Sequence, residues 1–154
     1  HMRIALPTEG RLCGCGRRGC LEAYGSATAI IGRVREEVPA YRGPTVLRDL
    51  LTTKGEEVTA KDVFTAAASG DALAAKVIDD TAYYLALGAC NVIATVDPDM
   101  IAFGGGISAA GEPFLNAIRG YVSRFALTYP ASKVQVRYAQ LGSDAGFIGA
   151  AACA

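Results

Sequence analysis

Residues 11–26 read RLCGCGRRGCLEAYGS and place three of the chain's five cysteines within eight positions. These cysteines are Cys13, Cys15 and Cys20, and glycines stand between them. Glycine permits the sharp backbone turns that can aim three sulfur atoms at one point. The stretch therefore predicts a tight loop with clustered thiols. Glu22 follows two residues after the last of these thiols.

Three thiolates need a fourth ligand to complete the tetrahedral shell of a structural zinc ion. The chain's single histidine stands upstream at position 1 and can supply it. The predicted zinc ligands are His1, Cys13, Cys15 and Cys20. We expect Arg17 and Arg18 to lower the pKa of the thiols by offsetting thiolate charge. A loop of reduced thiols and a Cys-x-Cys redox pair remain as alternatives. A His-Met start is also typical of a cloning scar, although its spacing from Cys13 favours a native histidine.

The overall composition excludes several classes of protein. The chain has 154 residues, of which 51% are hydrophobic and 19% charged, so it can form the core of one domain or of one lobe of a larger protein. Basic and acidic residues number 15 each, and we expect no nucleic-acid-binding face. The longest uncharged run, 81–96, is shorter than the roughly 20 apolar residues of a membrane helix. An odd cysteine count and no visible signal peptide predict a cytoplasmic protein, with Cys90 and Cys153 as isolated buried thiols.

Hydrophobic periodicity predicts alternating helices and strands. Helices are expected over about 27–37 with Ser26 as N-cap, after Thr59 as N-cap, from Asp71 to 96, and over 112–127. Residues 45–57 are interpreted as a surface insertion. MIAFGGGIS (100–108) predicts a buried strand that ends in a tight turn, and 133–139 alternates like a second strand. A last helix would be capped by Ser143 or Asp144. The pattern favours an α/β lobe with a partly parallel sheet flanked by helices.

Three motifs resemble the ROK family of repressors, open reading frames and sugar kinases. CGCGRRGCLE (13–22) matches its Cys-x-Cys-Gly-x-x-Gly-Cys-x-Glu signature, and His1 stands where the family's zinc histidine is expected. IAFGGGIS (101–108) and LGSDAGFIGAA (141–151) match two further landmarks in order. The resemblance covers nearly all of residues 1–154. It implies an actin-like, ribonuclease H-like ATPase lobe, with a zinc knuckle over 1–22 and an α/β remainder.

The resemblance also implies roles for particular residues. Glu22 would accept hydrogen bonds from sugar hydroxyls, and His1 would serve both the zinc ion and the sugar. Gly104, Gly105 and Gly106 would let the backbone approach the ATP phosphates, opening a helix N-terminus toward them. Taken without the family, Glu22 would be read as a surface charge at a helix start.

The implied function is an ATP-dependent hexose kinase of glucokinase type, with glucose as the first candidate sugar and Mg-ATP as the phosphoryl donor. Kinases for N-acetylmannosamine, fructose or another hexose are alternatives, and so is the sugar-sensing lobe of a ROK transcriptional repressor. The family's Asp-x-Gly-x-Thr phosphate loop and Asn-Asp pair have no counterpart in 1–154. We therefore expect a C-terminal lobe that contains no catalytic residue and is inactive alone. A homodimer or homotetramer is expected.

Overall fold

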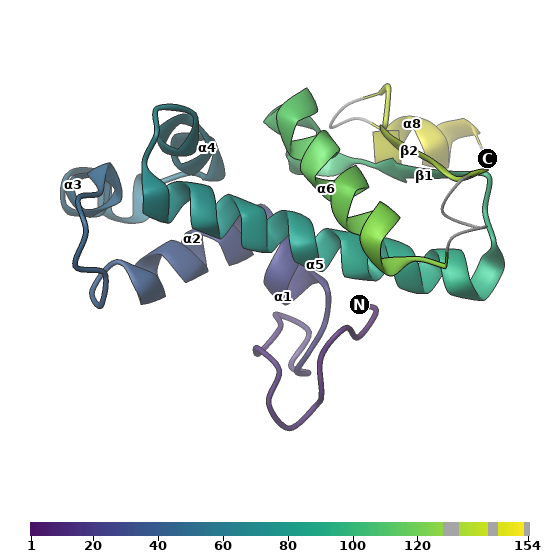
Figure 1. The fold of residues 1–154 in the computed structure, drawn as a ribbon, viewed down its shortest axis with the longest axis horizontal. Coiled ribbons are helices and arrows are strands. Elements are labelled where there is room, and N and C mark those ends of the chain that lie inside the picture. The colour runs from purple at the N-terminus through teal and green to yellow at the C-terminus, as the bar shows by residue number, and fades with distance from the viewer. Residues whose placement is uncertain (128–132, 142–144, 153–154) are drawn as a thin grey trace. The chain divides into compact units, whose positions relative to one another are not determined.

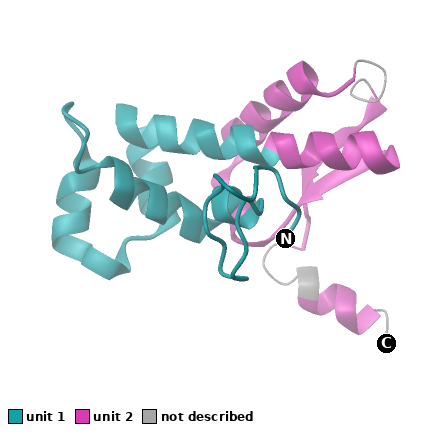
Figure 2. Ribbon diagram, turned by 90° about the horizontal axis from the view of Figure 1, so that it is seen from below, with its two compact units in different colours: residues 1–85 teal, residues 86–154 magenta. Residues whose placement is uncertain are grey.

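The structure is a computed structural model that describes residues 1–127, 133–141 and 145–152. It divides into two units, His1–Leu85 and Ala86–Ala154, which Figure 2 shows in teal and magenta. A 25-residue helix, α5 (Ala72–Val96), begins in the first unit and ends in the second. Each unit has its own buried residues and is described separately.

The first unit combines an N-terminal loop with a set of helices (Figure 1). Residues 1–21 form the loop and carry two isolated β-bridges but no named strand. The elements that follow are α1 (Glu22–Gly25), α2 (Ala27–Glu37), α3 (Val46–Lys54), the 3-10 helix η1 (Gly55–Glu57), α4 (Ala60–Ala68) and the first part of α5. The side chains that fill the core of this unit include Ile30, Val34, Leu47, Val63, Leu73 and Val77.

Side-chain caps define where the helices of this unit begin. Ser26 accepts a hydrogen bond from the Ala29 N–H at 3.1 Å and caps α2, as predicted. Thr59 and Asp62 form a reciprocal capping box at the start of α4, which confirms the predicted helix after Thr59. Asp71 precedes α5, and its carboxylate accepts from the Ala74 N–H at 2.9 Å. Such caps satisfy N–H groups that have no partner within the helix.

Most residues of 45–57 are exposed, but the prediction of a surface insertion there did not include the helices that the segment forms. These residues form α3 and η1, and Leu47 on α3 is fully buried. Thr45 accepts from the Leu47 N–H, and Asp71 accepts from the Val46 N–H at 2.7 Å. The buried carboxylate of Asp71 therefore joins the starts of α3 and α5. The helix was missed because its start depends on this distant acceptor and not only on adjacent sequence.

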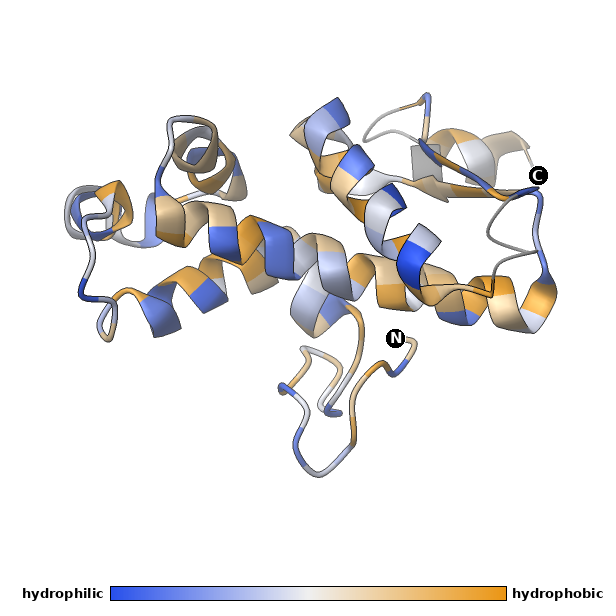
Figure 3. Ribbon diagram, viewed as in Figure 1, coloured by the Kyte–Doolittle hydropathy of each residue, from blue (hydrophilic) through white to orange (hydrophobic). Residues whose placement is uncertain are grey.

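The second unit is an α/β arrangement built on a two-stranded parallel sheet. Its described elements are the end of α5, β1 (Met100–Phe103), the 3-10 helix η2 (Gly105–Ala110), α6 (Glu112–Phe125), β2 (Gln135–Tyr138) and α8 (Ala145–Ala152). Strands β1 and β2 pair in parallel with Met100 opposite Gln135, which agrees with the predicted partly parallel sheet. Figure 3 shows hydrophobic and hydrophilic residues alternating along α6, and the residues it buries are Phe114, Leu115, Ile118 and Val122.

Some expectations for this unit need correction or lie outside the described residues. The predicted buried strand, β1, is not buried. Its residues alternate between exposed and half-buried, and Met100 is 54% exposed. An apolar run predicts strand formation, whereas burial depends on neighbouring elements. Cys90 is half-buried. Ser143, Asp144 and Cys153 fall outside the described residues. Among the residues described, no helix is both long enough and apolar enough to span a membrane.

The capping box of α4 predicts that stability will fall in acid. An ion pair with Lys54, 2.7 Å long, and hydrogen bonds from Thr59 lower the pKa of Asp62 to about 2. Because this lies below the unfolded value of about 3.9, the Asp62 carboxylate stabilises the fold above a pH of about 4, and the contribution is lost as pH falls toward 2. Asp62→Asn should therefore lower the free energy of unfolding near neutral pH and progressively less in acid.

Urea unfolding at several pH values between about 6 and 3 measures this difference. Glu57→Gln is the control, since Glu57 is an exposed carboxylate in the neighbouring η1. It should change the free energy of unfolding only slightly. An Asp62→Asn penalty that stayed constant across the same range would contradict the prediction.

Candidate functional site

The N-terminal loop returns to its own start and brings His1 beside the cysteines. The Leu21 N–H donates to the Met2 carbonyl at 2.7 Å, and the Ile4 N–H donates to the Gly19 carbonyl at 2.8 Å. These bonds pair the first residues of the chain with the segment that ends the thiol cluster. This backbone pairing thus brings His1, which is distant from the cysteines in sequence, next to them in the structure.

Glycines allow the loop to fold this tightly. A Cβ atom on Gly10 would lie 2.6 Å from the backbone of Gly19, so two chain segments touch where neither can carry a side chain. Gly19 also has φ +80°, in the left-handed region that favours glycine. Within the turn, the Cys13 N–H donates to the Arg17 carbonyl at 2.8 Å. The prediction that glycines would direct the thiols toward one another is confirmed.

Four donor atoms converge in this loop. The sulfurs of Cys13, Cys15 and Cys20 and a ring nitrogen of His1 all lie within 4.8 Å of one another. Cys15 Sγ is 3.7 Å from Cys20 Sγ, and Cys13 Sγ is 3.6 Å from His1 Nδ1. Zinc bonds of about 2.3 Å to sulfur and about 2.1 Å to nitrogen, meeting at the tetrahedral angle, give edges of about 3.8 and 3.6 Å. These two edges therefore match those of a tetrahedral metal site, and all four donors lie within reach of one ion.

The thiols do not respond alike to their surroundings. A backbone hydrogen bond from Arg17 is the main cause that lowers the pKa of Cys15, and the Arg17 charge adds less. Burial, followed by the neighbouring thiols, raises the pKa of Cys20 to about 11. The expectation that the arginines would lower the pKa of every thiol is therefore wrong. A bound divalent cation would override this difference in pKa between Cys15 and Cys20, because a thiol that coordinates a metal is deprotonated outright.

Glu22 lies against the donor group. It is the first residue of α1, and its Oε2 is 3.0 Å from His1 Nδ1 and 3.7 Å from Cys13 Sγ. Its side chain is 56% exposed, so the carboxylate borders the cluster and also reaches solvent. The structure thus brings together His1, Glu22 and the three predicted thiols.

A cavity that sequence reasoning missed adjoins this carboxylate. It measures about 510 Å³, and Glu22, Ser26 and Thr28 are among the residues that line it. Arg11 and Glu36 also line it and form an ion pair with each other. The cavity offers carboxylate and hydroxyl groups of the kind that bind a polyhydroxy ligand. No local pattern predicted it, because its wall joins the loop to α1 and α2.

The predicted glycine turn belongs to the second unit. Gly105 has φ +74°, and among the described residues no atom outside the adjacent chain lies within 4 Å of where a Cβ on Gly105 or Gly106 would stand. Gly104 is the N-cap of the 3-10 helix η2, Gly105 and Gly106 are its first residues, and α6 begins only after Gly111. The triplet therefore leads into η2 and does not open an α-helix, although its backbone is open to close approach.

The sequence matches the ROK family over residues 1–154. The chain belongs to the ROK family. This ROK chain is 40% identical over 149 residues to a glucokinase of Halalkalibacterium halodurans, and the match covers 97% of the chain. It resembles the crystal structure of a ROK family glucokinase from Streptomyces griseus in complex with glucose and AMPPNP, with a TM-score of 0.79, 30% identity and full coverage of the chain.

A ROK transcriptional regulator also has a similar fold. The crystal structure of this homologue of the E. coli MLC protein matches 90% of the chain with a TM-score of 0.72 and 30% identity. The ROK chain spans 44% of the Halalkalibacterium protein, 49% of the Streptomyces chain and 33% of the regulator. Its α/β fold, with a small parallel sheet and flanking helices, is thus similar to that of ROK sugar kinases.

Proposed function

We propose that this ROK chain is the metal-bearing lobe of an ATP-dependent hexose kinase of glucokinase type. The observation that carries the proposal is the position of Glu22, whose carboxylate borders the four-donor cluster and which lines a cavity. The likeness to two glucokinases favours phosphorylation of a sugar 6-hydroxyl by Mg-ATP. The chain contributes binding and positioning, and it supplies no catalytic base.

The metal in this proposal is zinc in a structural role. Its four ligands would be His1, Cys13, Cys15 and Cys20, and the donor spacing supports this set. A closed shell of four protein ligands leaves no open position for water, which is typical of structural zinc. Bound zinc would supply stability to a loop that has no apolar core of its own. It would also stiffen the segment that leads into Glu22.

Glu22 and His1 are the proposed sugar contacts. A carboxylate can accept charge-assisted hydrogen bonds from two neighbouring hydroxyls of a hexose such as glucose. Glu22 has the exposure for this, because its side chain is 56% exposed. The imidazole would use one ring nitrogen for the metal and the other for a sugar hydroxyl. The alternative, in which Glu22 is only a surface charge at a helix start, does not account for the neighbouring cavity.

The nucleotide would meet the glycine turn of the second unit. Gly104, Gly105 and Gly106 leave the backbone without side chains, and the described part of the chain places no contact against the last two. Such a surface admits phosphate oxygens close to main-chain N–H groups. The Streptomyces griseus glucokinase was crystallised with AMPPNP, which supports ATP as the donor.

Phosphorylation of hexoses by the protein that carries residues 1–154 tests this proposal. With ATP, magnesium and glucose, a coupled assay should give turnover of roughly 1 to 100 per second. N-acetylmannosamine and fructose are the comparison sugars and should react more slowly. The fragment 1–154 alone should give only background. Zinc-loaded protein that phosphorylated none of these sugars would contradict the proposal.

The sugar-sensing lobe of a repressor is the second candidate, and the likeness to the ROK transcriptional regulator favours it. In that case the protein would bind hexose without turnover, and sugar would change its affinity for operator DNA. Hexose-dependent DNA binding together with an inactive coupled assay would establish this alternative.

A further inference from the structure

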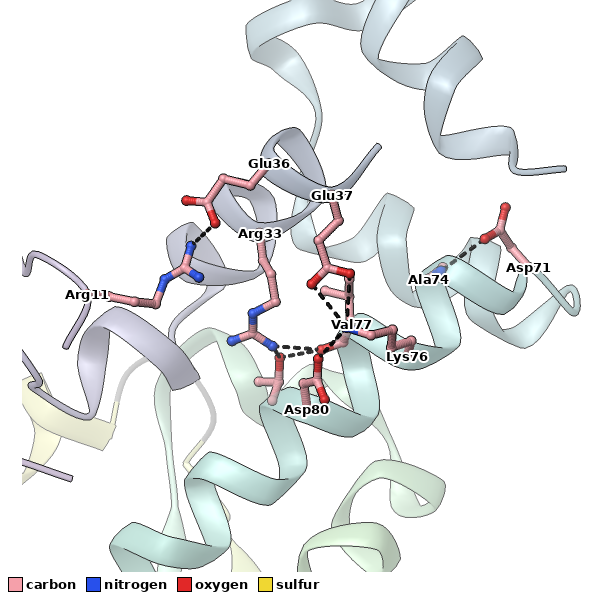
Figure 4. A network of polar contacts seen from close by, with 10 residues as sticks. Arg11, Arg33, Glu36, Glu37, Asp71, Ala74, Lys76, Val77 and Asp80 are labelled. Carbon is pink, nitrogen blue, oxygen red and sulfur yellow. Dashed lines mark hydrogen bonds and ion pairs between the residues drawn. The ribbon is translucent and has the colours of Figure 1, made fainter. Parts of the chain in front are cut away.

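Arg33 places a charged side chain in the interior of the first unit. It lies on α2 and is only 4% exposed. Its guanidinium donates to the Tyr24 carbonyl at 2.7 Å, to the Val77 carbonyl at 3.1 Å and to Thr81 Oγ1 at 3.2 Å. Figure 4 shows Arg33 reaching from α2 toward Val77 on α5. One side chain thus holds α1, α2 and α5 together.

Burying the charge of Arg33 costs free energy, so the arrangement is favoured only where the geometry that it enforces is needed. A buried charge loses its hydration, and a hydrogen-bonded carboxylate is its usual compensation. The hydrogen bonds found for Arg33 among the described residues go to carbonyl and hydroxyl oxygens instead. The nearby Glu37 and Asp80 carboxylates both accept from Lys76. The fork of the guanidinium, which can hold several acceptors in fixed directions, is therefore its main contribution.

Tyr24 extends the contact from Arg33 to the thiol loop. It is 6% exposed and lies on α1, two residues after Glu22. Its hydroxyl accepts from the backbone N–H of Arg11 at 2.8 Å, two residues before Cys13. Its ring packs against Tyr84 with centroids 4.4 Å apart. Arg33 thus holds the main chain of Tyr24, while the Tyr24 hydroxyl holds the loop.

We infer that Arg33 and Tyr24 are positioning residues. They hold the loop of metal donors and Glu22 in a fixed position relative to α2 and α5. The inference concerns the metal loop directly, and its consequence for hexose binding rests on the proposed function. Neither side chain belongs to the four-donor group. Both side chains act indirectly on the site. Tyr24 holds the backbone of Arg11, and Arg33 holds the backbone of α1.

Tyr24→Phe in the full-length protein is the decisive variant, because it keeps the ring and removes only the hydroxyl. Zinc affinity, measured by competition with a chromophoric chelator, should fall about ten- to hundred-fold, as it does when groups that orient metal ligands are lost. The amide of Arg11 should exchange with solvent faster in the metal-free protein. The KM for hexose should rise with little change in kcat, because binding geometry is affected and not the chemical step.

Tyr84→Phe is the matched control. It removes a hydroxyl from the same aromatic cluster, and among the described residues no hydrogen bond of that hydroxyl is found. Its zinc affinity should equal that of the wild type. Arg33→Lys is the second variant, because a lysine keeps the charge but cannot hold α1 and α5 at once. It should weaken zinc binding in the same direction.

The outcomes separate this inference from the proposed function. Unchanged zinc affinity and unchanged Arg11 exchange in Tyr24→Phe would overturn the inference, as would a wild-type protein that binds no zinc. A lower thermal midpoint without those changes would show a purely structural role and would overturn it too. Weaker zinc binding in a protein that phosphorylates no hexose would support the positioning role and contradict the kinase.

Discussion

Cys15→Ser is expected to abolish stoichiometric zinc binding and to lower the thermal midpoint of the full-length protein. Serine cannot supply the thiolate that zinc prefers, and three remaining donors leave the tetrahedral shell open. Binding of structural zinc contributes about 10 to 16 kcal/mol in small zinc peptides, so even partial loss is large beside the stability of a domain. Cys15 is suited to the test because its side chain is exposed, and the substitution leaves no cavity in a core.

Metal analysis of protein purified without chelator measures this outcome, together with thermal unfolding. Cys90→Ser is the matched control, since Cys90 lies on α5 outside the donor group. It should keep one zinc per chain. Adding a strong chelator to the wild type should reproduce the lower midpoint of Cys15→Ser. Wild-type protein without zinc, or a Cys15→Ser variant that keeps it, would show that the loop is not a zinc site.

Glu22→Gln is expected to weaken hexose binding while zinc stays bound. Glutamine preserves the size of the side chain, but its amide cannot accept two charge-assisted bonds as a carboxylate does. Loss of one such bond costs about 1.5 to 3 kcal/mol, or about ten- to hundred-fold in affinity. Because Glu22 lies beside the four donors and is not one of them, the metal and the fold should remain.

Glucose titration of the two proteins, with zinc content and thermal midpoint measured on the same samples, checks this result. Glu9→Gln is the control, because Glu9 is an exposed carboxylate in the same loop and does not line the cavity. It should bind glucose as the wild type does. Equal glucose affinity in Glu22→Gln and wild type would assign Glu22 the role of a helix-start charge.

Local sequence was sufficient wherever a structure depends on neighbouring residues. Ser26 and Thr59 cap the helices that they were predicted to cap, because each side chain bonds an N–H group three residues ahead. The thiol loop could be predicted because glycine is the residue that tolerates its turns. The parallel pairing of β1 and β2 followed from the alternation of strand and helix. All of these depend on short-range geometry.

Features that depend on distant partners could not be predicted in this way. Helix α3 begins where Asp71, 25 residues further along, accepts the Val46 N–H. The cavity beside Glu22 has walls from the loop and two helices. Exposure of β1 is decided by which elements cover it, and an apolar run does not contain that information.

The sequence by itself determined which chemical groups the thiol loop contains and that they could meet around a metal, since spacing and glycine content are local properties. Only the tertiary structure decided how that loop is held. Arg33 is separated from Val77 by 44 positions, and the Tyr24 hydroxyl reaches back to Arg11 across 13. Hydrogen bonds over such separations form only after the helices have packed, because closing the intervening chain costs entropy that packing must offset. The position of Glu22 relative to α2 and α5 is therefore a property of the folded unit.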